Sequence, residues 1–302
     1  MKFVTFLHNG RQRVGIIDPE RGAVWPIADF IPDFTGNLLD LVRGFEEVNN
    51  ILAPADDGIP INDVSLCAPI PCPERNILCV GKNYLEHSKE FQASGFDQSS
   101  GPAPSDAPEA PIIFTKAPSS VIATGDSIYW NPQVTQQVDY EAELGVIIGK
   151  EGRGISNSDA YSHVWGYLII NDVTARDLQK NHKQWFLGKS QDSFCPMGPW
   201  VASADEVDPE NLELRCWIND ELRQSANTRD LIFDIPTLIE TISAGITLQP
   251  GDIISTGTPS GVGIGFNPPK FLKPGDKIRI TIEGLGELSN QIRSNADTVA
   301  PS

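Results

Sequence analysis

The stretch VDYEAELGVIIG, residues Val138–Gly149, places two glutamates one residue apart at the start of an apolar run. Its valine and isoleucine content predicts a buried strand. Residues i and i+2 of a strand point to the same face, so Glu141 and Glu143 are neighbours and Asp139 extends the row. Like charges repel. Either positive groups compensate these carboxylates, or they share a proton, or the face lies in water.

Similar apolar runs recur along the chain and predict a β-rich main domain. Clusters of Gly, Pro, Asn and Asp separate them, and few stretches have helical spacing. We expect strands over 76–81, 111–116, 142–149, 166–172, 212–220, 252–257 and 277–283, and helices over 83–91, 158–164 and 235–245.

The N-terminal residues predict a small separate domain. Residues 1–66 combine short strands with one helical stretch over 35–53, and the proline-rich segment 67–75 reads as a linker. We therefore expect an N-terminal α+β domain and linker over residues 1–70 and a catalytic domain over 71–302. The segment 92–111 is rich in Ser, Gly and Pro, which predicts a mobile loop over a site or a tolerated surface insertion.

Composition excludes several classes of partner. The 302 residues carry 23 Lys and Arg against 40 Asp and Glu, a formal net charge of -17. We expect neither nucleic acid nor a membrane as a partner, because both carry negative charge. An anionic substrate then needs a local positive centre. Five cysteines without a CxxC pair predict neither disulfides nor a zinc site, which fits a cytoplasmic protein.

A third carboxylate, Asp172, ends the apolar run 166–172. Carboxylate ligands favour a hard cation such as Mg²⁺ or Mn²⁺ and leave positions open for substrate oxygens. The sequence therefore offers a metal site formed by Glu141, Glu143 and Asp172. The alternative is an edge strand whose glutamates face water.

Seven stretches in order resemble the fumarylacetoacetate hydrolase family over roughly residues 71–292. They are ILCVGKNYLEHSKE, PIIFTKAPSSV, VDYEAELGVIIGK, GYLIINDVTARDLQ, QWFLGKSQDSFCPMGPW, LIETISAGITLQPGDIISTGTPSGVG and LKPGDKIRITIEGLGELSNQI. The chain looks most like bacterial members that have an extra N-terminal domain and include oxaloacetate decarboxylases. The resemblance implies an α+β, β-rich fold with a mixed β-roll or barrel, and a homodimer.

The resemblance also implies roles for the acidic cluster and its neighbour. Glu141, Glu143 and Asp172 match the family's ligands for Mg²⁺ or Mn²⁺. Lys189 matches a catalytic lysine beside the metal, where its charge would offset the carboxylates.

Other residues match the family's catalytic and substrate positions. His87 and Glu90, at i and i+3 of a helix, match a catalytic dyad on a lid, and this spacing lets the carboxylate orient the imidazole. Gln179 and Thr258 match substrate contacts. Lys82 replaces an arginine of some relatives at a position that binds a carboxylate.

These residues together predict chemistry on a small anionic 2-oxo acid. Its carboxylate and keto oxygens suit a divalent cation, and cleavage between C3 and C4 leaves the enolate of pyruvate. We expect oxaloacetate decarboxylation. The alternatives are hydrolysis of an acylpyruvate or fumarylpyruvate, with His87 and Glu90 activating water, and isomerisation or decarboxylation in aromatic catabolism. A non-catalytic binding protein is the hypothesis from another class, but it has no need of the dyad.

Overall fold

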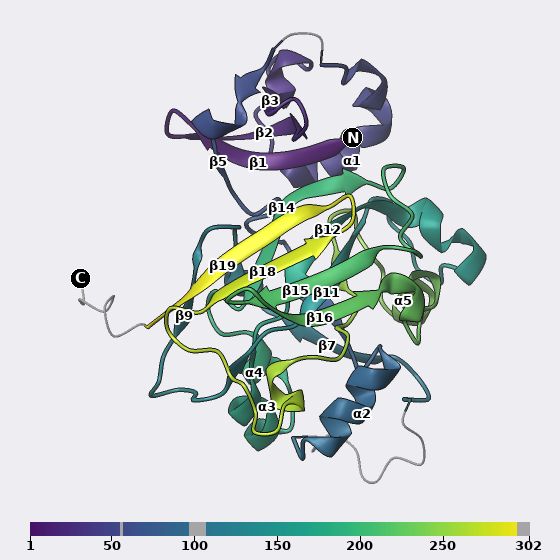
Figure 1. Ribbon diagram of the computed structural model, residues 1–302. Coiled ribbons are helices and arrows are strands. Elements are labelled where there is room, and N and C mark those ends of the chain that lie inside the picture. The colour runs from purple at the N-terminus through teal and green to yellow at the C-terminus, as the bar shows by residue number, and fades with distance from the viewer. Residues whose placement is uncertain (55–56, 97–106, 295–302) are drawn as a thin grey trace.

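Two packed β-sheets form the body of the protein in the computed structural model (Figure 1), which describes residues 1–54, 57–96 and 107–294. The larger sheet has 12 strands, most of them in the order β4-β3-β2-β1-β14-β12-β11-β17-β6-β7, and the smaller has five, in the order β16-β15-β18-β19-β9. The strands of the larger sheet are β1 Lys2–His8, β2 Arg11–Asp18, β3 Ala23–Pro26, β4 Ile59–Pro60, β5 Ser65–Leu66, β6 Ile77–Gly81, β7 Ile112–Lys116, β8 Val121–Ile122, β11 Ala142–Ile148, β12 Val164–Asn171, β14 Cys195–Ser203 and β17 Ile253–Ser255.

The smaller sheet and a two-stranded ribbon complete the β-structure. The five-stranded sheet contains β9 Ser127–Trp130, β15 Glu213–Ile218, β16 Glu221–Asn227, β18 Lys277–Ile282 and β19 Gly286–Ser294, and the ribbon pairs β10 Val138–Asp139 with β13 Thr174–Ala175. The inner faces of both sheets contribute to one apolar core, in which Leu144, Tyr167 and Ile280 are buried. The expected β-rich α+β fold and all seven expected strands are confirmed.

A closed barrel is not formed by the described strands. The larger sheet ends at β4 on one side and β7 on the other, and these two strands are not paired with each other. The expected roll is therefore an open sheet and does not close into a barrel.

Helices cover the ends of the sheets. They are α1 Leu38–Val48, α2 Leu85–Ala93, α3 Arg176–His182, α4 Phe186–Lys189 and α5 Ile235–Ser243. Asn37 caps α1 in a reciprocal box with Asp40, and Asp234 caps α5 by accepting from the Thr237 N–H. The expected α-helix over 158–164 is instead a 3-10 helix over Asn157–His163, and only Ala160 of it is buried. One buried side chain gives no apolar face to stabilise an α-helix.

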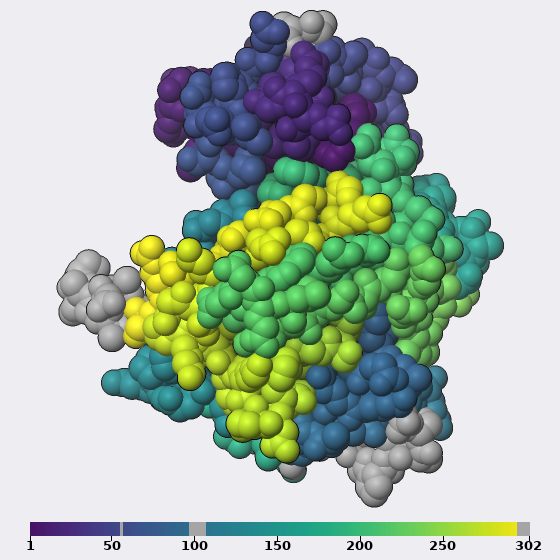
Figure 2. Space-filling model, viewed as in Figure 1, coloured from purple at the N-terminus to yellow at the C-terminus, as the bar shows by residue number. Residues whose placement is uncertain are grey.

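The N-terminal strands continue the larger sheet. β1 pairs antiparallel with β14, with Phe3 opposite Val201, although almost 200 residues separate them. In the space-filling view the purple and blue N-terminal residues form a cap over the remainder (Figure 2). The division of the chain near residue 70 stays a prediction. Among the described residues, none of the helices has the length and apolarity needed to cross a membrane.

Candidate metal and substrate site

The three carboxylates of the predicted metal site meet where β11 begins and β12 ends. These strands are antiparallel neighbours with Ala142 opposite Asn171, so Glu141 and Asp172 lie side by side, and the Asp172 N–H donates to the Glu141 carbonyl at 2.8 Å. One oxygen each from Glu141, Glu143 and Asp172 lie within 4.8 Å of one another. All three side chains are buried, and β11 is an inner strand between β12 and β17. The alternative of glutamates facing water is wrong.

Buried cations surround the acidic cluster and compensate its charge. Lys189 Nζ lies 2.7 Å from both Glu141 Oε2 and Asp172 Oδ2. Arg176 Nη2 lies 2.6 Å from Glu141 Oε1, and Lys116 Nζ lies 2.6 Å from Asp172 Oδ1. Removing one partner of such a buried pair leaves the other charge buried without compensation, which lowers the free energy of unfolding by about 3–5 kcal/mol.

The two neighbouring glutamates have opposite protonation behaviour. Burial opposes ionisation of Glu141, but Lys189 and Arg176 outweigh burial and lower its pKa from 4.5 to about 2. Burial raises the pKa of Glu143 to about 8, and the nearby Asp172 and Glu141 act in the same direction. The neighbouring cations therefore stabilise the ionised form of Glu141. Glu143 keeps its proton near neutral pH unless a cation binds beside it.

Lys189 stays protonated in this setting. Burial disfavours its charge, but Asp172 and Glu141 outweigh burial and raise the pKa of Lys189. The ammonium group is thus a fixed positive charge and a hydrogen-bond donor, and it is a poor proton acceptor.

The expected dyad lies on α2, as the helical spacing predicts. His87 Nδ1 is 3.2 Å from Glu90 Oε2, and His87 is buried. The Gly261 N–H donates to the two Glu90 oxygens at 3.0 and 3.2 Å. Since Glu90 occupies Nδ1, the other ring nitrogen of His87 is left to exchange a proton with a ligand.

The three expected substrate residues line the same cavity as Glu141 and Glu143. Gln179 Oε1 accepts from Arg176 Nη1 at 3.1 Å, which leaves the amide NH₂ to donate to a ligand. Thr258 Oγ1 accepts from Gln224 Nε2 at 2.8 Å, so its own proton is free to be donated. Lys82 has a φ of 57°, an uncommon conformation for a residue with a side chain, at the rim of this cavity.

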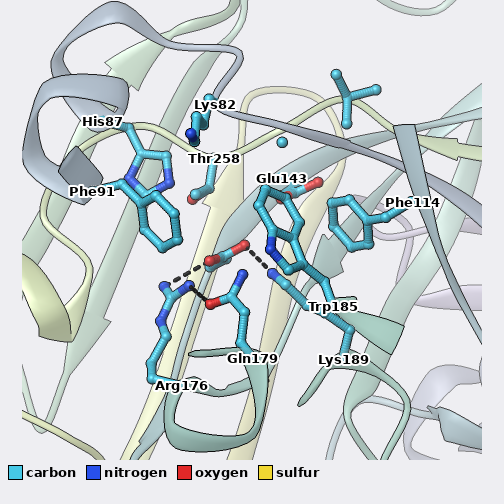
Figure 3. Close-up of a pocket in the computed structure, with 13 residues that line it drawn as sticks. Lys82, His87, Phe91, Phe114, Glu143, Arg176, Gln179, Trp185, Lys189 and Thr258 are labelled. Atoms are coloured by element: carbon cyan, nitrogen blue, oxygen red, sulfur yellow. Dashed lines mark hydrogen bonds and ion pairs between the residues drawn. The ribbon is translucent and has the colours of Figure 1, made fainter. Parts of the chain in front are cut away.

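The cavity is small and has a polar floor with aromatic walls. The space between its lining side chains, including the part open to solvent, is about 280 Å³. Figure 3 shows Arg176, Gln179 and Lys189 on one side, His87 and Lys82 across from them, and Phe91, Phe114 and Trp185 between. The charged and amide groups on its floor suit a small polar ligand.

The donor set fits a divalent cation. Three carboxylates are hard oxygen ligands. Among the described residues, Glu143 accepts only through Oε2, from Ser255 Oγ at 2.5 Å and the Gly257 N–H at 2.9 Å, so Oε1 remains for a further ligand. With Glu143 ionised, the buried charges of the site are four carboxylates against four cations, namely Asp139, Glu141, Glu143 and Asp172 against Lys82, Lys116, Arg176 and Lys189. A divalent ion would make the site net positive and attract an anion.

Sequence reasoning missed the buried cations Lys116 and Arg176. Arg176 lies four residues after Asp172 and three before Gln179, so its place in DVTARDLQ is a signal that helical spacing could have used. Lys116 ends an apolar strand, which is an unusual place for a lysine unless it has a buried partner. Cys195 is buried, and burial raises the pKa of its thiol to about 12.

Comparisons with known proteins agree with the family suggested by the sequence. Residues 76–293 match the family described as Fumarylacetoacetate (FAA) hydrolase C-terminal. Oxaloacetate tautomerase YisK of Bacillus subtilis (strain 168) is 54% identical over 233 residues, which are 77% of this chain and 74% of that protein.

Solved structures extend the similarity to almost the whole chain. Fumarylacetoacetate hydrolase from psychrophilic Exiguobacterium antarcticum is 43% identical with a TM-score of 0.82, covering 97% of this chain and 99% of that chain. Maleylpyruvate hydrolase from Sphingobium sp. SYK-6, in complex with manganese(II) ion and pyruvate, is 33% identical with a TM-score of 0.76 at the same coverage.

Proposed function

The chain belongs to the fumarylacetoacetate hydrolase family, and on that premise we propose that it interconverts the enol and keto forms of oxaloacetate with a divalent cation. The observation that carries the proposal is the arrangement of one small cavity. Its walls combine Glu141 and Glu143 of the acidic cluster, the cations Arg176 and Lys189, and the imidazole of His87. The similarity to an oxaloacetate tautomerase supports the choice of substrate.

Glu141, Glu143 and Asp172 would hold the cation, Mg²⁺ or Mn²⁺. When bound, it would supply Lewis-acid stabilisation of the negative charge that develops on the keto oxygen of a 2-oxo acid. The manganese ion and pyruvate in the maleylpyruvate hydrolase structure support both the metal and the ligand class.

His87 would carry out the proton transfer. In the keto-to-enol direction its free ring nitrogen takes a proton from C3, the electron pair forms the C2–C3 double bond, and the keto oxygen gains a proton from solvent or a nearby donor. In the reverse direction the imidazolium returns the proton to C3. Glu90 would orient the ring and stabilise its charged form. Proton transfer by a positioned side chain such as His87 contributes about 10²–10⁴-fold to the rate.

The remaining side chains would orient the substrate. Lys189 and the NH₂ group of Gln179 are placed to donate to its oxygens, and Thr258 adds a hydroxyl donor. Lys82 would bind the carboxylate farther from the acidic cluster. Because these groups are held by other protein contacts, they need little reorganisation during the reaction.

Decarboxylation of oxaloacetate, the reaction expected from the sequence, is the second candidate. It leads to the enolate of pyruvate, and the related maleylpyruvate hydrolase structure contains pyruvate. In this reaction His87 would act only afterwards, by protonating C3 of the enolate.

A substrate panel tests these assignments. Oxaloacetate, acetylpyruvate, fumarylpyruvate and fumarylacetoacetate are assayed with Mg²⁺ and with chelator, following enol-to-keto conversion and product formation separately. We expect rapid, metal-dependent conversion of oxaloacetate and slower turnover of the larger acids. Turnover of an acylpyruvate faster than either oxaloacetate reaction would make the protein a hydrolase. Inactivity on the whole panel would reject the proposed substrate class.

A further inference from the structure

The loop from Gly261 to Gly265 is the surface on which the helix α2 rests. The Gly261 N–H binds Glu90 of this helix, and a Cβ on Gly265 would lie 1.7 Å from Glu90 Oε1, so only glycine permits this approach. Val262 and Ile264 join Phe91 of α2 in one apolar cluster. The position of His87 over the cavity therefore depends on the position of this loop.

One buried carboxylate, that of Asp139, supports the loop from the opposite side. Asp139 Oδ1 accepts from the Gly263 N–H at 2.7 Å, and Oδ2 accepts from the Ile264 N–H at 3.1 Å. The side chain is fully buried and does not line the cavity. A carboxylate that accepts backbone N–H groups makes strong, charge-assisted hydrogen bonds.

The same carboxylate holds the arginine of the site. Arg176 Nε donates to Asp139 Oδ2 at 2.9 Å, while the other end of the guanidinium lies against Glu141 and donates to Gln179. Glu141 and Asp139 outweigh burial and raise the pKa of Arg176, so its charge is permanent.

The lid helix also contacts this arginine directly. Arg176 Cζ is 6.0 Å from the centre of the Phe91 ring, and in Figure 3 Phe91 lies between His87 and Arg176. Asp139 thus binds two parts of the site that belong to different secondary-structure elements. One is the loop 261–265 that supports α2, and the other is Arg176 beside the acidic cluster.

We infer that Asp139 is a positioning residue that couples the closed position of α2 to the orientation of Arg176. Its carboxylate accepts hydrogen bonds from the loop 261–265 and from Arg176 at the same time. A shift of the loop therefore weakens the hydrogen bond to Arg176, and a shift of Arg176 weakens the hydrogen bonds to the loop. Ligand binding against Arg176 then favours the closed helix, and closure favours binding by the same factor. The affinity readout of this inference rests on the proposed function, but its hydrogen-exchange readout needs no ligand.

The test is Asp139→Asn, studied by amide hydrogen exchange in the full chain without ligand. Loss of the charge-assisted bonds should make residues 261–264 and 88–93 exchange about 10–100-fold faster. Asp252→Asn is the matched control, because Asp252 also is buried, pairs with an arginine (Arg75, 2.6 Å) and accepts a backbone N–H, but lies outside the cavity. This control should leave both segments at the wild-type rate.

Affinity supplies the second readout. Oxalate, a small dianion, is titrated with Mg²⁺ into each variant by calorimetry, and the affinity of Asp139→Asn should fall about 10–100-fold, as when residues behind a metal site are changed. Faster exchange at α2 with unchanged oxalate affinity would overturn the coupling. Equal exchange in Asp139→Asn and wild type would overturn the role of Asp139 altogether.

Arg176→Lys keeps the inference testable if Asp139→Asn does not fold. This substitution retains a positive charge toward Glu141 but removes the Nε donor to Asp139. We expect faster exchange at residues 261–264, because the N–H groups of this loop bind a carboxylate that has lost its Arg176 partner. Wild-type exchange there would refute the coupling.

Discussion

The two neighbouring glutamates should respond in opposite ways to the same substitution. In protein stripped of metal, Glu143→Gln should raise the free energy of unfolding at pH 7, whereas Glu141→Gln should lower it. The reason is that burial raises the pKa of Glu143 to about 8, while Lys189 and Arg176 lower that of Glu141 to about 2.

The magnitude follows from linkage between protonation and folding. At pH 7 folded Glu143 keeps a proton that the unfolded chain, with an ordinary pKa of 4.5, releases. One pH unit corresponds to about 1.4 kcal/mol, so burying this group costs at most about 3 kcal/mol at pH 7. Glutamine removes that cost and still accepts from Ser255. Glutamine at position 141 removes the negative partner of the buried cations Lys189 and Arg176, which lowers the free energy of unfolding by about 3–5 kcal/mol.

The pH dependence has a definite sign. A carboxyl group whose pKa is raised by folding makes the folded state hold more protons, so wild-type stability falls as pH rises from about 5 to 8. Glutamine does not titrate. The advantage of Glu143→Gln should therefore be absent near pH 5 and reach its maximum near pH 8.

Thermal and urea unfolding of wild type and both variants, with chelator and with Mg²⁺, measures these effects. In chelator we expect Glu143→Gln to melt several degrees above wild type at pH 8. Mg²⁺ at about 100 times its Kd should stabilise wild type by about 3 kcal/mol and Glu143→Gln hardly at all. A lower melting temperature of Glu143→Gln in chelator, or wild-type stabilisation of that variant by Mg²⁺, would refute the reasoning.

Three further predictions concern the lid, the buried lysine and the assembly. His87→Ala should slow enol-to-keto conversion of oxaloacetate by about 10²–10⁴-fold, because His87 donates the proton to C3 in that reaction. Decarboxylation should slow much less, because its bond-breaking step involves no proton transfer; equal losses in the two assays would count against a proton-transfer role. Lys116→Met should lower the free energy of unfolding in chelator by about 3–5 kcal/mol, because Asp172 stays buried and loses its partner at 2.6 Å. An unchanged urea midpoint would show that Lys189 alone compensates the charge of Asp172. Sedimentation at micromolar concentration should show a homodimer, and a monomer would contradict the family-based expectation.

Local patterns predicted much of the fold and the position of the acidic cluster. The apolar run after Glu141 gave the central strand, because seven consecutive buried residues leave a clear trace in composition. The local sequence did not indicate the pairing of β1 with β14, because the two strands are almost 200 residues apart and either could pair elsewhere. Register over such distances depends on the assembled sheet.

The site divides in the same way. Glu141, Glu143 and Asp172 could be recognised as one cluster because their types and positions at strand ends suit a metal. The roles of His87 and Glu90 came only from the family resemblance, because this pair at i and i+3 is common on exposed helices.

The role of Lys116 was missed because its partner is distant in sequence. Lys116 meets Asp172 across 56 residues, and Asp139 meets the loop at Gly263 across 124. Such contacts are decided by which strands become neighbours, and no local spacing records them.

The central claim is that this protein forms the enol of oxaloacetate in a metal-dependent site. The most direct measurement is the rate at which the C3 protons of oxaloacetate exchange with deuterium oxide, followed by proton NMR with wild-type protein in Mg²⁺ and in excess chelator. We predict strong acceleration over the uncatalysed exchange in Mg²⁺ and loss of that acceleration in chelator. Exchange at the uncatalysed rate in Mg²⁺, or equal acceleration in chelator, would contradict the claim.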